Sequence, residues 1–432
     1  MELKQIFLAF KVKDLRKKIL FILLIFAIFR FLAAIPIPAI DRYTFKEILE
    51  KSSAFLAQYG FFRLLNVFTG GALERFSIVM LGLGPYITAT IILQLLTLMI
   101  PSLEKMYKEG GREGREKFEQ YGRILTVPLS MLQGFAMIRL WSQQKILPHL
   151  SLLETLSSVF AISGATLLLM WLGELISEKG LGNGVSLLIF AGIAADFPTN
   201  IGALITTFQA FQILNYLIFF LMVILILTSV VIVNEARRNI PINYTKRVRG
   251  TRLFGGVSTF LPISLNPAGV IPIIFAISLL TFPPTIAQFL VQNPGILGKI
   301  AKATISFFEN QILYSILYFL LVFVFTYFYT SIVFDPKSLA ENLQKFGGFI
   351  SGIRPGPQTA NYLSFVLNRI LLFGGIFLGL IAIMPSIVQA ITKVGAFRFL
   401  TGGTSLLILV SVVLETAKAI QAELESREYD TI

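Results

Sequence analysis

Long apolar stretches are the feature that most limits what this chain can fold into. Several approach or exceed 18 residues, and 214–233 and 312–334 are two examples. A helix needs about 20 apolar residues to cross the hydrocarbon layer of a membrane. In addition, 55% of the 432 residues are hydrophobic and only 14% are charged, unlike the composition of a soluble domain. The sequence therefore predicts an all-α protein that crosses a membrane several times.

The apolar stretches divide into ten predicted spans. Their approximate cores are 19–38, 76–99, 122–141, 154–176, 184–204, 212–233, 268–290, 310–334, 366–390 and 399–420. Lys and Arg concentrate before the first span and in the loops after the second, sixth and eighth spans. Because basic loops stay on the cytoplasmic side, we expect both termini in the cytoplasm. The same rule accounts for the net charge of +13 without a nucleic-acid partner.

Two of the predicted cytoplasmic loops, 235–265 and 335–365, are unusually long for simple connections. Both mix Gly, Pro, apolar residues and Arg, a composition that disordered segments rarely have. The sequence favours an ordered docking surface for a cytosolic partner. The alternative is that these loops only fix the orientation of the spans in the membrane.

Several kinds of chemistry are excluded by the residues present. The chain has no cysteine, and its one histidine, His149, lies in a short loop. An intramembrane protease needs paired aspartates or a Ser-His pair within the spans, and neither is present. Arg30 and Glu174 are the ionisable candidates within spans, too few for a proton relay. We therefore expect no enzyme, no metal and no cofactor, and a passive pathway or one driven from outside the chain.

Eight segments, in order along the chain, resemble a known family. They are IPIPAID (35–41), FTGGALERFSI (68–78), PYITATIILQLL (85–96), KEGGREGREK (108–117), MWLGELISEKGLGNGVSLLIFAGI (170–193), NPAGVIPIIFA (266–276), GIRPGPQTANYL (352–363) and GGTSLLI (402–408). Together they run over essentially the whole chain. The sequence resembles the SecY family, the large subunits of the bacterial Sec protein-conducting channel.

This resemblance implies a gated channel for unfolded polypeptides in the cell inner membrane, which also releases transmembrane segments sideways into lipid. It implies ten helices in two halves, 1–205 and 206–432, related by an inverted pseudo-repeat. The expected partners are the SecE and SecG subunits, the SecA motor ATPase, the ribosome, signal peptides, nascent polypeptides and membrane lipid. The motor or the ribosome supplies the energy, and the chain binds no nucleotide of its own.

The run 61–68 is apolar but too short to cross a membrane, and it stops at a glycine pair. By the resemblance it is the plug, a half-helix within about 58–72 that enters from the outer side. Its members would be Phe61, Phe62, Arg63, Leu64, Leu65, Asn66, Val67 and Phe68, with Gly70 and Gly71 as the hinge. The second span is then expected to start near Phe76. The alternative interpretation is an amphipathic turn at the membrane surface.

The resemblance also implies a ring of aliphatic residues at the constriction of the pore. The matching positions are Leu83, Ile87, Val185, Ile189, Ile274 and Ile408. The first four form two pairs spaced four apart, so each pair can lie on one face of its helix. Apolar side chains bind no ions and discourage water in a narrow neck. By sequence alone, ordinary packing explains the same residues.

The lateral gate would lie between spans 76–99 and 122–141 on one side and 268–290 and 310–334 on the other. Thr88 and Gln94 are polar residues on its first helix. Such contacts between helices are worth around 0.6 kcal/mol. Simple packing of a polar residue is an equal alternative.

For docking of the motor or ribosome, the resemblance and the residue type indicate Arg247, Arg249 and Arg354, since Arg offers planar donors that Lys lacks. The alternative is that these arginines are topology signals only.

Without the family motifs, a secondary transporter with inverted repeats is the next hypothesis. A scaffold for membrane-protein assembly is a third. Uptake of small solutes without a motor would favour the transporter, and complete lack of translocation would favour the scaffold.

Overall fold

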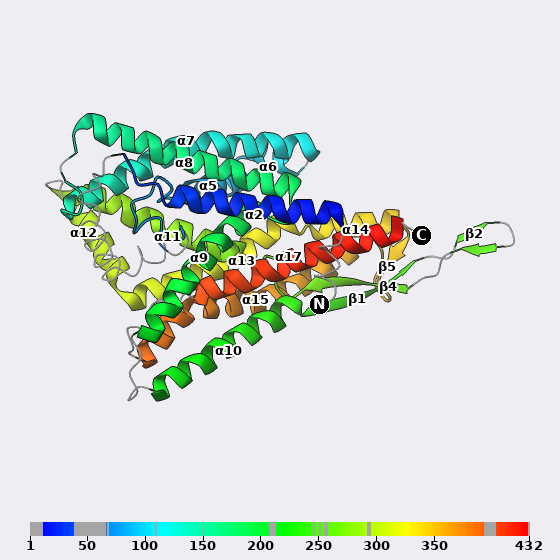
Figure 1. Ribbon diagram of the computed structural model, residues 1–432. Coiled ribbons are helices and arrows are strands. Elements are labelled where there is room, and N and C mark those ends of the chain that lie inside the picture. Colours follow the sequence, from blue (N-terminus) through cyan, green and yellow to red (C-terminus); the bar gives the residue numbers. More distant parts are fainter. Residues whose placement is uncertain are drawn as a thin grey trace.

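The computed structural model describes residues 12–38, 66, 69–108, 110–148, 150–206, 213–244, 247–249, 252–254, 258–291, 295–392 and 403–430. Long helices lie roughly side by side in a bundle (Figure 1). Strands β1 (Arg237–Tyr244) and β4 (Ser258–Ser264) project from one end of this bundle, and helix α12 (Ile296–Glu309) lies across the other end (Figure 1).

Each predicted span overlaps a long helix of the structure. In chain order these helices are α2 Lys13–Ala33, α5 Gly84–Met99, α7 Gly111–Gln143, α8 Leu152–Lys179, α9 Gly184–Thr206, α10 Ile213–Glu235, α11 Ile271–Leu290, α13 Gln311–Val333, α15 Pro357–Thr392 and α17 Gly403–Asp430. The shorter helices are α6 Pro101–Lys108, α12 Ile296–Glu309 and α14 Pro336–Lys345. The prediction of an α-helical bundle is confirmed.

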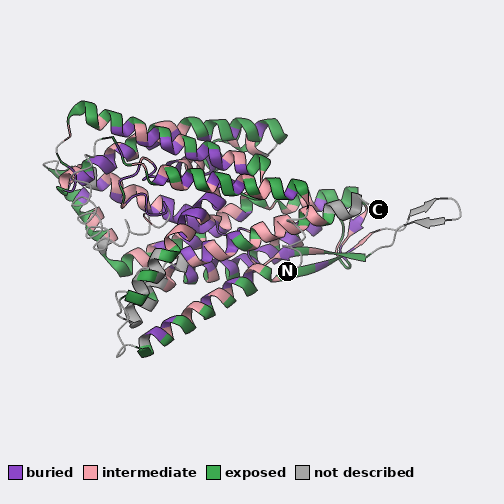
Figure 2. Ribbon diagram, viewed as in Figure 1, coloured by how far each residue is buried: buried purple, intermediate pink, exposed green. Residues whose placement is uncertain are grey.

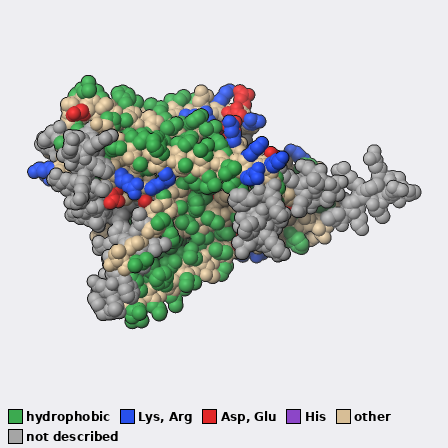
Figure 3. Space-filling model, viewed as in Figure 1, with side chains coloured by type: hydrophobic (Ala, Val, Ile, Leu, Met, Phe, Trp, Pro, Cys, Tyr) green, Lys and Arg blue, Asp and Glu red, His purple; other side chains and the backbone are tan. Residues whose placement is uncertain are grey.

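Many of the helices have the length and apolar composition of membrane-spanning helices. Within the described ranges, six helices are long and apolar enough to cross a membrane, or seven if the bent pair α5 and α6 forms one span. Figure 3 shows hydrophobic side chains spread over the side of the bundle, with charged side chains gathered mainly toward its two ends. The chain is a multi-pass membrane protein, and the count of ten spans stays a prediction.

The predicted start of the second span near Phe76 is wrong. The chain makes turns from residue 69 to residue 83, and α5 begins only at Gly84. Phe76 has a φ of 49°, which a right-handed helix cannot contain. The backbone there bonds to the segment after α2 instead, because Ile37 N–H donates to the Phe76 carbonyl at 2.9 Å and Ile78 N–H donates to the Ile35 carbonyl at 3.0 Å.

The two long loops contain a small antiparallel sheet, which is an addition to the all-α prediction. In the first loop, β1 Arg237–Tyr244 pairs with β4 Ser258–Ser264, and β2 Arg247–Arg249 pairs with β3 Arg252–Phe254 farther out. The second loop contributes α14 and β5 Gly348–Phe349, which pairs with β1. The strand order is β4-β1-β5. Residues about 100 positions apart in the sequence therefore share one sheet at the same end of the bundle.

One large apolar cluster fills the centre of the bundle. Its buried members come from α2, α5, α8, α9, α10, α11, α13, α15 and α17. Figure 2 shows buried residues along the middle of the bundle and exposed ones on the outer helix faces. A second cluster packs the turns at 69–83 against α7 and α8, with Phe76 edge-on to Trp141 at a ring-centroid distance of 4.7 Å. Helices from both predicted halves thus share the central cluster.

Candidate functional site

The six aliphatic residues of the predicted ring lie in a single apolar environment. Leu83, Ile87, Ile189, Ile274 and Ile408 are buried members of the central cluster, and Val185 is partly buried and packs against it. They come from the start of α5, from α9, from α11 and from α17. Four separate helices therefore bring these side chains to one cluster. Aliphatic side chains from several helices meet in this way both in a closed constriction and in ordinary core packing, so the ring stays a prediction.

The position of Val185 and Ile189 depends on a close approach between two helices. α9 begins at Gly184, where an added Cβ would overlap the carbonyl oxygen of Gly173 on α8. The Gly184 N–H donates to Ser177 Oγ at 2.9 Å, and Ser186 N–H donates to Asn183 Oδ1 at 3.1 Å. The glycine-rich GLGNG segment therefore starts a helix that must pack closely against its neighbour.

The glycine pair of the predicted hinge is a tight turn held by two distant helices. Gly70 and Gly71 have φ of 65° and 77°, a region that favours glycine. An added Cβ on Gly70 would lie 2.8 Å from a guanidinium nitrogen of Arg30 and 2.9 Å from Gly192 Cα. One on Gly71 would lie 3.2 Å from a carboxylate oxygen of Asp196. The turn is thus enclosed by α2 and α9.

Asn66 is the one residue of the predicted plug that the structure describes; Phe61 to Leu65, Val67 and Phe68 lie outside the described residues. The Asn66 carbonyl accepts from Gly71 N–H at 2.9 Å and from the Thr69 hydroxyl at 3.0 Å. Its side-chain oxygen accepts from Glu74 N–H at 2.9 Å. The end of the predicted plug segment is therefore bonded to the turn that follows it.

Arg30, an ionisable residue within the first predicted span, has partners in the folded bundle. Its guanidinium donates to the Gly70 carbonyl at 2.7 Å and interacts electrostatically with Asp196. Arg75 adds a second positive charge nearby. No local sequence pattern indicates this pairing, because Arg30 and Asp196 lie on helices that are far apart in the chain.

The helices of the predicted lateral gate contact one another. α11 packs against α5, α7 and α13. Thr88 and Gln94 are both buried, and the Thr88 hydroxyl donates to the Gly84 carbonyl of its own helix at 2.9 Å. The side-chain oxygen of Gln94 has no hydrogen-bond partner among the described residues. A buried amide oxygen of this kind makes the local packing less favourable than full hydrogen bonding would.

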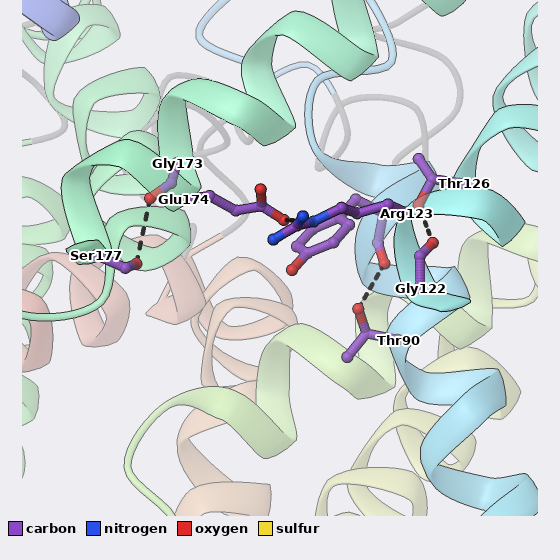
Figure 4. Close-up of polar contacts among 8 residues, drawn as sticks. Thr90, Gly122, Arg123, Thr126, Gly173, Glu174 and Ser177 are labelled. Atoms are coloured by element: carbon purple, nitrogen blue, oxygen red, sulfur yellow. Dashed lines mark hydrogen bonds and ion pairs between the residues drawn. The ribbon is translucent and has the colours of Figure 1, made fainter. Parts of the chain in front are cut away.

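Sequence reasoning missed an ion pair beside this gate. Arg123 Nε on α7 lies 2.8 Å from Glu174 Oε1 on α8, and both side chains are partly exposed. Figure 4 shows Arg123 and Glu174 pointing toward each other, while the hydroxyls of Thr126 and Ser177 bond locally along their helices. The Glu174 carboxylate thereby links α8 to α7.

A polar network that the sequence did not indicate anchors the start of α11. Asn266 donates to Asn234 Oδ1 at 3.0 Å and to the Gly269 carbonyl at 3.1 Å. Asn234 also donates to Ser411 Oγ at 2.8 Å. Lys418 donates to the Asn234 carbonyl at 3.2 Å. These bonds connect the end of α10, the segment before α11, and α17.

The predicted docking residues lie on the two loops that share the sheet. Arg354 is exposed, and its carbonyl accepts from the Thr359 hydroxyl at 3.0 Å, which holds the turn before α15. Arg247 and Arg249 lie on β2, and their side chains are outside the described part of the structure. Asn243 on β1 donates to Ser351 Oγ at 2.8 Å, so the loops are joined by side chains as well as strands.

We searched the described residues for a possible metal site. Among the described residues, no group of three or more His, Cys, Asp or Glu side chains is placed to hold a metal ion.

Comparison with known proteins gives consistent matches over most of the chain. A family model described as SecY matches residues 77–417. The protein translocase subunit SecY of Streptomyces galbus is 42% identical over 98% of each chain. The same subunit of Thermotoga maritima is 39% identical over 98% of this chain and 96% of that one.

Solved structures resemble this one in fold. A structure described as that of a protein-conducting channel has a TM-score of 0.62 at 18% identity, covering 93% of this chain and 91% of that one. Sec61 in the canine ribosome-channel complex from the endoplasmic reticulum has a TM-score of 0.60 at 18% identity, with the same coverage. At this identity the likeness shows the fold alone.

Proposed function

Because this chain belongs to the SecY family, we propose that its six clustered aliphatic residues form the closed constriction of a protein-conducting channel. The chain is a protein translocase subunit of the channel-forming type, and it is not an enzyme. Since the chain belongs to this family, we no longer favour a secondary transporter or a scaffold for membrane-protein assembly. The two halves, 1–205 and 206–432, are proposed as the inverted repeats that flank the pathway.

The observation that carries this proposal is the meeting of α5, α9, α11 and α17 at one buried aliphatic cluster. Each helix contributes one or two of the six residues, and none of the six is charged or polar. A narrow apolar neck of this kind excludes water and ions while it is closed. It also yields to a passing polypeptide, because its side chains make no directional bonds.

Disulfide crosslinking tests the constriction directly, since the chain has no cysteine of its own. Single cysteines at Ile87, Ile189 and Ile408 would be paired with an arrested precursor that carries one cysteine. We expect crosslinks at all three positions only while the precursor is engaged. Leu221 on α10 is exposed on the side of the bundle and serves as the control. Crosslinking at Leu221 equal to that at the three ring positions would contradict the pathway.

We propose that 61–68 is the plug and that Gly70 and Gly71 are its hinge. The enclosure of the glycine turn by Arg30 and Asp196 supports this, because it fixes one end of the segment at the bundle. Motion of the segment would then start from this fixed turn. Release of Arg30 from the Gly70 carbonyl would free the turn.

We propose that lateral release to lipid occurs between α5 and α7 on one side and α11 and α13 on the other. The contacts of α11 with α5 and α7 support this site, and so does the incompletely bonded, buried Gln94 oxygen on α5. The polar network at Asn266 holds the segment before α11 to α10 and α17.

The joined loops of the sheet are the proposed docking surface for the ribosome and for the SecA motor. Sec61 and yeast Ssh1, both similar in fold, were solved in complexes with ribosomes. We further propose SecE and SecG as subunits, signal peptides and nascent polypeptides as substrates, and a cytoplasmic membrane location with both termini in the cytoplasm. Purification of the chain in mild detergent tests the subunits, since a small single-span protein should accompany it.

A further inference from the structure

Helix α12 has three distinct faces. Gly298 and Ala301 are buried on the first. Lys299, Lys302 and Ser306 are exposed on the second. The third face is exposed and apolar, and it consists of Ile296, Ile300, Ala303 and Phe307. The spacing of these four residues follows one side of a helix. Ile296 and Ile300 are 76% and 58% exposed, so nothing in the described structure covers this face.

The position of α12 limits what can cover the apolar face. α12 packs on α11 and α13, with Phe308 against Tyr314 of α13, and lies across the end of the bundle opposite the β1–β4 strands (Figure 1). α13 follows directly after Asn310 and is long and apolar enough to cross a membrane. The exposed apolar side chains of α13 start at Ile312, which is five residues after Phe307, and continue with Ile316. The apolar face of α12 therefore lies where a spanning helix enters the hydrocarbon layer.

Charge and size favour a lipid surface over a protein partner. Lys299 and Lys302 flank the apolar face, and residues 296–308 contain no acidic residue. Lysine stems can lie along apolar surface while their ammonium groups reach a polar layer. A helix of 14 residues is about 20 Å long, so one face offers far less than the roughly 800 Å² that a stable protein interface needs on each side.

We propose that α12 lies in the outer headgroup layer of the membrane and that Lys299 and Lys302 bind the phosphates of anionic lipids. The apolar face enters the boundary between headgroups and acyl chains, as in other amphipathic interfacial helices. The two lysines lie one turn apart and face the same layer, which carries negative charge when anionic lipid is present. Since α12 packs on α11 and α13, this anchoring fixes the outer ends of both helices relative to the membrane.

Fluorescence quenching on the purified complex in phosphatidylglycerol vesicles tests the position of α12. A fluorophore is attached to a single cysteine at Ala303 on the apolar face or at Ser306 on the polar face. We expect nitroxide-labelled lipid to quench the Ala303 probe at least twofold more strongly than the Ser306 probe, and aqueous iodide to show the reverse order. Equal iodide quenching at both positions would place the face in water. Protection of Ala303 from both quenchers would mean that a protein covers it. Either result overturns the proposal.

Lipid selectivity tests the role of the lysines. The nitroxide is carried on phosphatidylglycerol in one sample and on phosphatidylcholine in another. The measured ratio is the quenching of the Ala303 probe by labelled phosphatidylglycerol divided by its quenching by labelled phosphatidylcholine. We expect the ratio to favour phosphatidylglycerol, by up to about fivefold per lysine. The Lys299→Gln/Lys302→Gln variant should bring the ratio close to one, whereas Lys145→Gln, an exposed lysine of another loop, should leave it unchanged. An unchanged ratio in the double variant overturns the assignment of the phosphate contacts.

Discussion

The guanidinium of Arg30 donates a 2.7 Å hydrogen bond to the carbonyl oxygen of Gly70, forty residues farther along the chain. This bond connects a helix of the membrane bundle to the turn that follows the proposed plug. The Asp196 carboxylate lies beside the same turn and interacts with Arg30. The hinge is thus held by charge as well as by the conformation of its glycines.

Replacement of Arg30 should loosen the closed state. Arg30→Gln removes a charged hydrogen bond, worth about 1.5–3 kcal/mol, from the state in which the turn is held. If the open state lacks this bond, the resting open probability should rise by about one to two decades. Single-channel recording in planar bilayers measures this. Arg139→Gln, an exposed arginine on α7, is the control. A variant as silent as the native channel would show that the bond does not hold the closed state.

A methyl group at Gly71 should destabilise the protein. At a φ of 77°, alanine costs roughly 1–2 kcal/mol more than glycine, and the new carbon would also press on Asp196. Gly164 on α8 has open space around it and a helical backbone, so Gly164→Ala should be neutral or stabilising by up to about 1 kcal/mol. Thermal unfolding in detergent compares the two. Similar midpoints for both variants would contradict the enclosed turn.

Polar substitutions in the aliphatic cluster should weaken the requirement for a signal peptide. In Ile87→Asn or Ile408→Asn, a buried amide without partners costs about 1–3 kcal/mol in the closed state, whereas an open, hydrated pore solvates it. Precursors with defective signal peptides should then be exported. The assay is export at equal expression, and Leu221→Asn on the exposed side of α10 is the control. Export no better than in the native protein would assign these residues to ordinary packing.

Charge reversal at Arg354 should nearly abolish secretion that depends on a motor. The residue is exposed on an ordered turn, and Arg354→Glu would repel an acidic partner surface without disturbing the fold. Transport of a precursor into inverted vesicles measures the effect. Lys337→Glu reverses an exposed charge on α14 in the same loop and should retain most activity. Equal loss in both variants would indicate a general charge effect instead of a specific contact.

The Arg123–Glu174 pair should show only a modest coupling energy. Both groups are partly exposed, so the pair is expected to contribute about 0.2–1 kcal/mol. A double-mutant cycle with Arg123→Gln and Glu174→Gln, read by thermal unfolding at low and high salt, tests this. The coupling should shrink at high salt because exposed charges are screened. A coupling that is unaffected by salt would mean that the pair is effectively buried.

The sequence predicted the helices well because backbone polar groups in lipid must form their hydrogen bonds within the same segment. An apolar segment can therefore be recognised as a helix without knowledge of its neighbours. A stretch of about 20 apolar residues must form a helix wherever it crosses a membrane. The glycine pair at 70–71 was likewise readable, since only glycine adopts its φ values at low cost. The resemblance indicated positions for a ring, a gate and docking loops. Five of the six ring positions are buried in one cluster and Val185 packs against it, while their role as a constriction stays a proposal.

Pairing between distant segments became visible only in the folded bundle. α5 starts at Gly84 because the turns before it bond to residues 35–37, which no local pattern encodes. Arg30 meets Asp196, Arg123 meets Glu174, and β5 joins β1 for the same reason. Length and composition were enough to identify the helical, apolar segments. Which polar groups meet between those helices was decided by packing, because a hydrogen bond or an ion pair depends on distances of a few ångströms that only the folded bundle defines.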